Sequence, residues 1–82
     1  ELNEERRKEL VKEIRKMGED AKVAIRAIRR DGIDEAKAMQ KNSEMTEDEL
    51  KMAEDNIQKL TDKNIDEIDS LTDAKEKEIM TV

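Results

Sequence analysis

Apolar residues recur along the first half of the chain at steps of three or four residues. The members of this series are Leu10, Ile14, Met17, Ala21, Ala24 and Ile28. Such spacing keeps the side chains on one face of an α-helix that packs along its length. Asn3 suits the N-cap, because its side-chain oxygen can accept a hydrogen bond from a backbone N–H, and Glu4 and Glu5 follow where the helix dipole favours acids. The pattern predicts a helix over about residues 3–41.

A second apolar series follows in the other half of the chain. Thr46 lies three residues before Glu49, an arrangement typical of a capping box at a helix start. The apolar positions after it are Leu50, Ala53, Ile57, Leu60, Ile65, Ile68, Leu71 and Ile79. They keep helical spacing with one slip after Leu60, so the sequence predicts a second helix over about residues 46–80.

The residues between the two series indicate a sharp reversal of the chain. Asn42 is suited to a left-handed C-cap and Ser43 to a turn. So short a connection, about residues 42–45, forces two consecutive helices into an antiparallel hairpin. We therefore expect an all-α fold in which residues 1–82 form a single helical hairpin.

Two glycines, Gly18 and Gly32, lie inside the first predicted helix, where each costs about 1 kcal/mol relative to Ala. The simpler interpretation is that they are weak points in a helix that is held by packing. The other interpretation is that Gly32 lets a second backbone come close to the helix beside a group of arginines.

The composition limits how much core such a hairpin can build. Only 34% of the 82 residues are hydrophobic, and there is no Phe, Trp or Tyr. Chains of this length bury only about 60% of the surface that they expose when unfolded. Two helices alone would leave an apolar strip in water, so we expect self-association, most simply as a homodimer with four antiparallel helices. The first residue is not Met, from which we expect that the chain was cut from something longer.

The residue types exclude several kinds of chemistry. The chain has no Cys and no His, so we expect neither a disulfide nor a zinc site, and no cofactor. Carboxylates need a concave, partly dry pocket to act as catalysts, which a two-helix hairpin does not offer, so we do not expect an enzyme. No apolar run approaches the roughly 18 residues of a membrane span, and no signal-peptide pattern opens the chain. We expect a cytoplasmic protein without a membrane partner.

One acidic segment begins like a calcium-binding loop, with Asp62, Asn64 and Asp66 at alternate positions. Such a loop needs Gly at its sixth position and a bidentate Glu at its twelfth. This chain has Glu67 and Asp73 there. We interpret the segment as an acidic helix face that holds no metal.

Charge is divided unevenly between the two predicted helices. Residues 1–41 hold twelve basic and ten acidic side chains, net +2, and residues 42–82 hold five and thirteen, net −8, in a chain of net charge −6. All six arginines lie in the first half. At about 100° per residue, nine basic residues of that half fall within an arc of about 140°, which we name the basic face. They are Arg7, Lys8, Lys12, Arg15, Lys22, Arg26, Arg29, Arg30 and Lys37. Glu4 and Glu19 interrupt this face.

Two interpretations of the basic face stay open. Charged helices usually carry solvated side chains that support the helix through pairs of opposite charge four residues apart. Alternatively the face binds a phosphate backbone, because the planar guanidinium group of Arg presents fixed donors to phosphate. The remaining acidic surface would then repel the nucleic acid and limit binding to one orientation. Without aromatic side chains to stack on bases, sequence-specific reading is not expected.

Three blocks of the sequence carry a resemblance to a known family: LNEERRKELVKEIRKMGEDAKVAIRAIRRD, EDELKMAEDNIQKLTDKNIDEID and AKEKEIM. They are similar to the C-terminal part of bacterial ribosome recycling factor, and the resemblance runs through essentially the whole chain. It implies an L-shaped protein whose long arm is an antiparallel three-helix bundle, with a small β-rich domain inserted between the first two helices. This chain would supply the second and third helices only.

The resemblance also implies a function. Members of the family split the post-termination ribosome together with elongation factor G, which hydrolyses GTP, and their helical arm touches ribosomal RNA of the large subunit at the subunit interface. The arginines implicated in the family match Arg7, Arg26 and Arg29 of this chain. Arg30 and Lys22 are neighbours that we add from the geometry of the basic face alone. The alternative function is a coiled-coil hairpin that mediates protein association and does not bind RNA.

Overall fold

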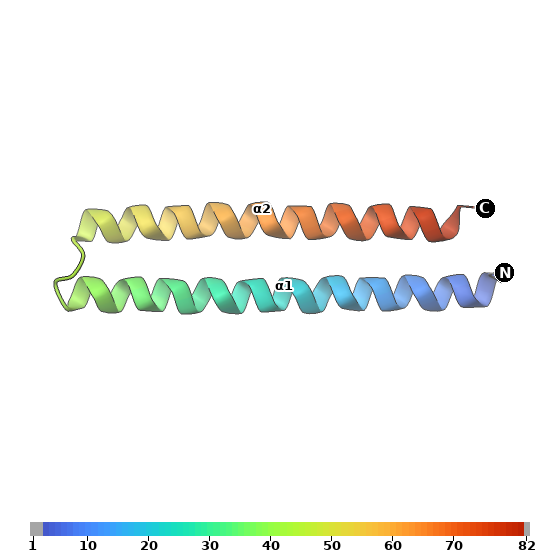
Figure 1. Cartoon of the computed structure of the whole chain (residues 1–82), viewed down its shortest axis with the longest axis horizontal. Helices are drawn as coiled ribbons and strands as arrows, with labels where there is room; N and C mark the ends of the chain where they lie inside the picture. Colours follow the sequence, from blue (N-terminus) through green and yellow to red (C-terminus); the bar gives the residue numbers. More distant parts are fainter. Residues whose placement is uncertain (1–2, 82) are drawn as a thin grey trace.

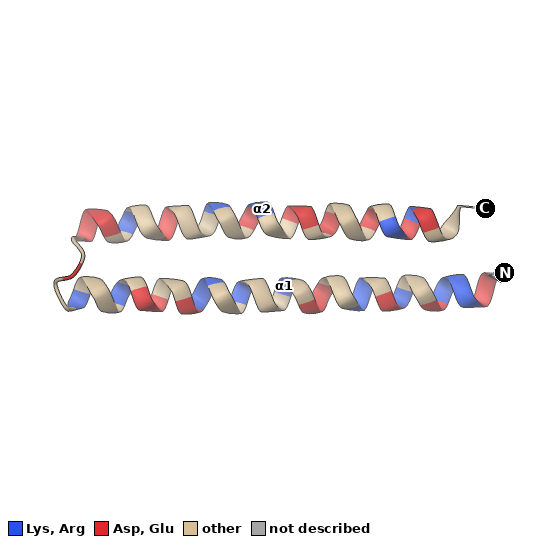
Figure 2. Ribbon diagram, in the orientation of Figure 1, with Lys and Arg blue, Asp and Glu red and all other residues tan. Residues whose placement is uncertain are grey.

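The chain folds into two long helices that run antiparallel, with both ends of the chain at the same end of the hairpin (Figure 1). The structure is a computed structural model and describes residues 3–81, so Glu1, Leu2 and Val82 of the predicted unit lie outside the described residues. Helix α1 spans Glu4–Lys41 and helix α2 spans Glu47–Met80. The described residues measure 61 × 15 × 11 Å. The predicted all-α antiparallel hairpin is confirmed, and charged residues occur along the length of both helices (Figure 2).

Both helices begin at the predicted N-caps. The Asn3 Oδ1 atom accepts a hydrogen bond of 2.7 Å from the backbone N–H of Arg6. At the second helix, the Thr46 hydroxyl accepts from the Glu49 N–H at 3.1 Å, and the Glu49 carboxylate accepts from the Thr46 N–H at 3.0 Å. The backbone bond from Thr46 lowers the pKa of Glu49. The predicted capping box is therefore confirmed.

The turn between the helices is a Schellman motif. The Glu44 N–H donates to the Met39 carbonyl at 2.8 Å, and the Ser43 N–H donates to the Gln40 carbonyl at 3.0 Å. Ser43 takes the left-handed conformation with φ of 62°, while Asn42 has φ of −86°. The prediction that Asn42 is the left-handed residue is wrong, because the Asn42 N–H still closes a bond to the α1 backbone and the reversal comes one residue later.

Small side chains form the line along which the two helices touch. Gly18 and Ala36 of α1 and Thr61 of α2 are the buried residues of the described chain. The Thr61 hydroxyl donates to the Ile57 carbonyl at 2.7 Å, so its polar atom is satisfied inside its own helix. Half-buried branched residues flank this line, and they include Val11, Ile14, Ile25, Ile65 and Ile68.

Several residues of the predicted apolar series do not pack between the helices. Met17 and Ile28 of α1 are 69% and 70% exposed, and Leu60 and Leu71 of α2 are 60% and 66% exposed. Their prediction as packed seam residues is wrong, as it is for the exposed Ala24. The helices approach each other along the neighbouring line of small residues, which leaves the larger side chains to one side. Ile28 and Leu60 line one groove on that side. Met17 lies eleven residues before Ile28 on α1, and Leu71 lies eleven residues after Leu60 on α2. Eleven residues are about three helical turns, so each pair shares one face of its helix. We name Met17, Ile28, Leu60 and Leu71 the apolar flank.

Of the two glycines, Gly18 has the closer neighbour on the opposite helix. A Cβ atom on Gly18 would lie 2.7 Å from the Thr72 hydroxyl oxygen, whereas a Cβ on Gly32 would lie 3.5 Å from the Ile57 Cδ1 atom, an ordinary contact. The glycine that allows a close neighbour is thus Gly18 rather than Gly32, and the neighbour is a side chain rather than a backbone.

This difference between the glycines predicts opposite effects of alanine. Gly32→Ala should stabilise the hairpin by about 1 kcal/mol, because Ala is the better helix former and the new methyl group fits. Gly18→Ala should instead destabilise the hairpin by about 1–3 kcal/mol, because the new methyl group would force Thr72 to move. Urea unfolding followed by circular dichroism at equal protein concentration measures both. Adding Thr72→Ala to Gly18→Ala should recover stability, and a Gly18→Ala variant as stable as Gly32→Ala would contradict the packing described.

The apolar flank leads us to propose that the 82-residue chain alone forms a homodimer of four antiparallel helices, as its composition predicts. Sedimentation equilibrium over a wide concentration range should show a monomer–dimer equilibrium. Replacing Ile28 and Leu60 by Glu should shift it to monomer, because a charge would then be buried at the contact. A parent chain that stays monomeric at every concentration would contradict the proposal.

Candidate nucleic-acid interface

Three arginines of the basic face are grouped within about one turn of α1. Arg26 and Arg30 are exposed and Arg29 is half-buried. Within residues 3–81, none of the three lies within ion-pairing distance of a carboxylate. Arg26 and Arg29 border a shallow groove whose other wall is α2. These guanidinium groups therefore keep their charge and donors available at the surface.

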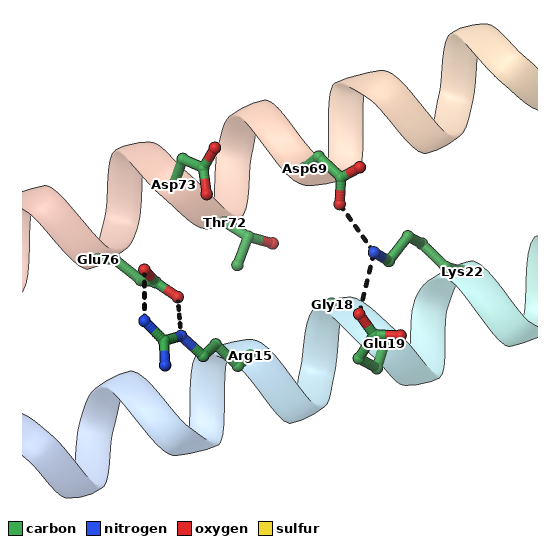
Figure 3. A pocket seen from close by; sticks show the side chains of 8 residues that line it. All are labelled: Arg15, Gly18, Glu19, Lys22, Asp69, Thr72, Asp73 and Glu76. Carbon is green, nitrogen blue, oxygen red and sulfur yellow. Dashed lines mark hydrogen bonds and ion pairs between the residues drawn. The ribbon is translucent and has the colours of Figure 1, made fainter.

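Three cations of the basic face, Arg29 among them, contact α2 through a series of side-chain contacts that we name the interhelical ladder. Its rungs are Arg15 with Glu76, Lys22 with Asp69, and Arg29 with Gln58. Figure 3 shows the first two rungs on either side of Gly18 and Thr72.

The first rung is a two-pronged ion pair. The Arg15 Nε atom donates to Glu76 Oε1 at 2.5 Å, and Nη2 donates to Oε2 at 3.3 Å (Figure 3). This hydrogen bonding raises the pKa of Arg15 and lowers the pKa of Glu76. The two residues are 61 positions apart in the chain, and this pair can form only in this lengthwise alignment of the helices.

The second rung places Lys22 between two carboxylates. Its Nζ atom lies 2.8 Å from Asp69 Oδ1 and 3.0 Å from Glu19 Oε1 (Figure 3), and its side chain is only 15% exposed. Hydrogen bonding to Asp69 first, and then to Glu19, raises its pKa. The helical wheel puts Lys22 on the basic face as a phosphate contact, but a phosphate would have to displace both carboxylates. Lys22 lies one turn before Arg26 on α1, but unlike the three arginines it is already paired with carboxylates.

The third rung uses an amide in place of a carboxylate. The Arg29 Nη1 atom donates to Gln58 Oε1 at 3.3 Å, and Gln58 Nε2 donates to Asp62 Oδ1 at 2.9 Å. Sequence analysis missed Gln58 because its importance depends on the register between the helices. The heptad spacing of Lys22 and Arg29 on one helix and of Asp62 and Asp69 on the other would indicate an ion pair between Arg29 and Asp62, and gives no signal for the amide contact.

Arg7 lies apart from the other arginines, near the open end of the hairpin. It precedes Arg26 by 19 residues, which is about 28 Å along α1. Its side chain is half-buried, and its Nε atom is buried without a hydrogen-bond partner in the described part of the chain. An unsatisfied buried donor on a cation is a position at which an added acceptor would be stabilising.

The segment that begins like a calcium loop continues through the middle of α2 without a break. Asp62 accepts from Gln58, and the Asn64 side chain donates to the Leu60 carbonyl at 2.8 Å. Over residues 3–81, no group of three or more His, Cys, Asp or Glu side chains is arranged to hold a metal ion. Neither described helix combines the length and apolar character that crossing a bilayer requires.

Comparison with known proteins decides the family. Residues 1–80 match the family model described as ribosome recycling factor. The chain belongs to the ribosome recycling factor family. Ribosome-recycling factors from Caldicellulosiruptor saccharolyticus, Acetivibrio thermocellus and Staphylococcus saprophyticus are 67%, 68% and 58% identical to it over 99–100% of its length. The chain spans 44–45% of the length of these ribosome-recycling factors. The resemblance carried by the three sequence blocks is thereby confirmed.

The ladder predicts how the stability of this ribosome recycling factor hairpin depends on pH. Because folding lowers the pKa of Glu76, its contribution is present above the ordinary value of 4.5 and disappears as the pH falls through the lower folded value. Glu76→Gln should therefore be less stable than the parent at neutral pH, and the difference should close on acidification. Urea midpoints from neutral to strongly acidic pH measure it.

A matched control for Glu76 is Glu67→Gln, which removes an exposed carboxylate of α2 with no ion pair among the described residues. The control should track the parent more closely. A stability gap between parent and Glu76→Gln that stays constant into acid would show that the ion pair does not stabilise the hairpin.

Proposed function

We propose that this chain is the rRNA-contacting helical part of a ribosome recycling factor. It docks on ribosomal RNA of the large subunit at the subunit interface and, with elongation factor G, helps to split the post-termination ribosome. Family membership supports the proposal, and so does the name ribosome-recycling factor carried by its relatives. Because the chain spans less than half of their length, we assign it the RNA contact and not the complete activity.

One observation of the structure carries the proposal. Arg26, Arg29 and Arg30 have no carboxylate partner in residues 3–81, although Arg15 and Lys22 on the same face do. Guanidinium groups bind phosphate through two parallel N–H bonds, and an uncompensated group binds it without first breaking an ion pair. Arg7, with its unsatisfied Nε atom, extends the proposed contact toward the open end.

The acidic surface of α2 supports a single binding orientation. With a net charge of −8 in residues 42–82, the second half of the chain repels a polyanion, while the group of arginines on α1 attracts it. RNA would therefore approach from the side of α1. Contacts to phosphate fix position without reading sequence, which suits a chain that lacks aromatic side chains.

The proposed mechanism is mechanical and makes or breaks no covalent bond. The hairpin is a rod 61 Å long whose helices are held in register by the interhelical ladder. Elongation factor G would exert force on another part of the longer protein. This force would reach the RNA contact, because the ladder resists sliding of α1 against α2. The alternative, a hairpin that only joins protein partners, would use the apolar flank and predicts no dependence of RNA binding on the arginines.

The test is binding to isolated large ribosomal subunits at several salt concentrations. Arg26→Ala/Arg29→Ala should weaken binding and reduce the slope of log K against log salt by about one for each phosphate that the variant no longer neutralises. The variant is made in the 82-residue chain and in a full-length factor that carries it.

The matched control is Lys59→Ala/Lys63→Ala, which removes two exposed cations of α2 that have no ion pair in the described residues. This pair should leave the salt slope close to that of the parent. Equal affinities and slopes for the parent and the arginine variant in the full-length factor would refute the RNA contact.

A further inference from the structure

We infer that Gln58 is a positioning residue that keeps Arg29 available to phosphate by holding the Asp62 carboxylate away from it. The inference rests on the proposed function, because the phosphate it concerns belongs to the RNA partner. It gives Gln58 a role in binding although the side chain lies on the acidic helix.

The register of the hairpin makes this role necessary. The two ion pairs of the ladder, Arg15 with Glu76 and Lys22 with Asp69, are seven residues apart on each helix. One further step of seven leads to Arg29 on α1 and Asp62 on α2. A cation and an anion thus occupy the next rung, and an ion pair is expected there by the same geometry.

The described residues form no ion pair at this rung. The carboxylate of Asp62 accepts from Gln58 Nε2 at 2.9 Å, and the guanidinium of Arg29 donates to Gln58 Oε1 at 3.3 Å. The amide oxygen faces the cation and the amide nitrogen faces the anion, the one orientation that satisfies both neighbours. Gln58 and Asp62 are four residues apart on α2, so the helix itself holds the amide beside the carboxylate.

An amide partner leaves Arg29 in a different state from its neighbours. Lys22 is held by two charged acceptors at 2.8 and 3.0 Å, and Arg15 by both oxygens of one carboxylate. Within the described residues, Arg29 has a single neutral side-chain acceptor at 3.3 Å, a weaker bond than a charge-assisted one, and its other N–H donors have no side-chain partner there. A phosphate can therefore bind Arg29 without displacing an anion.

The cations along the basic face therefore have different roles. The two rungs nearer the open end hold the helices together, and the rung nearer the turn gives its cation to the RNA. The main group of phosphate-binding cations is therefore Arg26, Arg29 and Arg30, and Arg26 and Gln58 line the same groove there.

Gln58→Ala tests this directly in binding to isolated large ribosomal subunits by the full-length factor. Without the amide, Asp62 and Arg29 are expected to pair, so the affinity should fall about two- to fivefold and the salt slope by about one. Gln58→Ala/Asp62→Asn should restore the parent slope, because no carboxylate then competes. Asn56→Ala, which removes an exposed amide of α2 without a side-chain hydrogen bond in the described residues, is the control.

A thermodynamic cycle provides a readout without RNA. The coupling between Arg29→Ala and Asp62→Asn in urea unfolding should be close to zero in the parent and should become measurable in the Gln58→Ala background. Parent-like binding by Gln58→Ala would overturn the inference, and so would the absence of new coupling in the Gln58→Ala background. Failure of Gln58→Ala/Asp62→Asn to recover the salt slope would overturn it as well.

The two proposals can fail separately. If Arg26→Ala/Arg29→Ala weakens binding but Gln58→Ala does not, the RNA contact stands and the role of Gln58 is rejected. If the arginine variant binds like the parent, the proposed function is rejected, and the role of Gln58 toward RNA is rejected with it.

Discussion

The line of close contact between α1 and α2 determines the rest of this structure. A chain without aromatic residues, and with charges on about half of its positions, cannot hold two helices together through a thick core. It brings them close instead, with Gly18, Ala36 and Thr61 at the contact. Close approach lets polar side chains at the edge reach the opposite helix, as Arg15 and Lys22 do. The same approach excludes the larger residues of the apolar flank from the contact.

A hairpin with a narrow contact line has two unlike flanks. One flank carries the exposed Ile28 and Leu60, and the other carries the interhelical ladder. On the flank that carries the interhelical ladder, two basic residues of the same type can have different kinds of partner on α2. Arg15 and Arg29 are both arginines on one face of α1, yet one faces a carboxylate and the other an amide. A helical wheel shows only that both arginines are charged and lie on one face. The structure shows that their partners on α2 differ in charge.

Local features of the fold could be read from the sequence because neighbouring residues determine them. The caps at Asn3 and Thr46 and the helical periodicity depend on residues within one or two turns. The left-handed residue is harder to place, since it depends on where the last backbone bond of α1 closes, and it is Ser43 rather than Asn42. Which of two adjacent apolar lines becomes the contact depends on the partner helix, and the sequence of α1 alone does not contain that information.

The candidate site likewise has features that the sequence predicts and features that depend on the partner helix. The resemblance to the family singles out Arg7, Arg26 and Arg29, and the helical wheel puts them with Lys22. The pairing of Lys22 with Asp69 requires the register between residues 47 positions apart, which no local pattern supplies. The amide contact of Arg29 escapes sequence analysis for the same reason.

The ladder also has an order in the chain that bears on how the hairpin forms and opens. Its rungs close loops of increasing length: 29 residues separate Arg29 from Gln58, 47 separate Lys22 from Asp69, and 61 separate Arg15 from Glu76. Loop closure costs more entropy as the loop lengthens, so pairing is favoured to start at the turn and proceed outward like a zipper. In the isolated hairpin, opening would run in reverse, from the open end toward the turn. In this order of opening, the two ion pairs would come apart before the part of the hairpin that carries Arg26, Arg29 and Arg30, whereas Arg7 lies in the part that would open early.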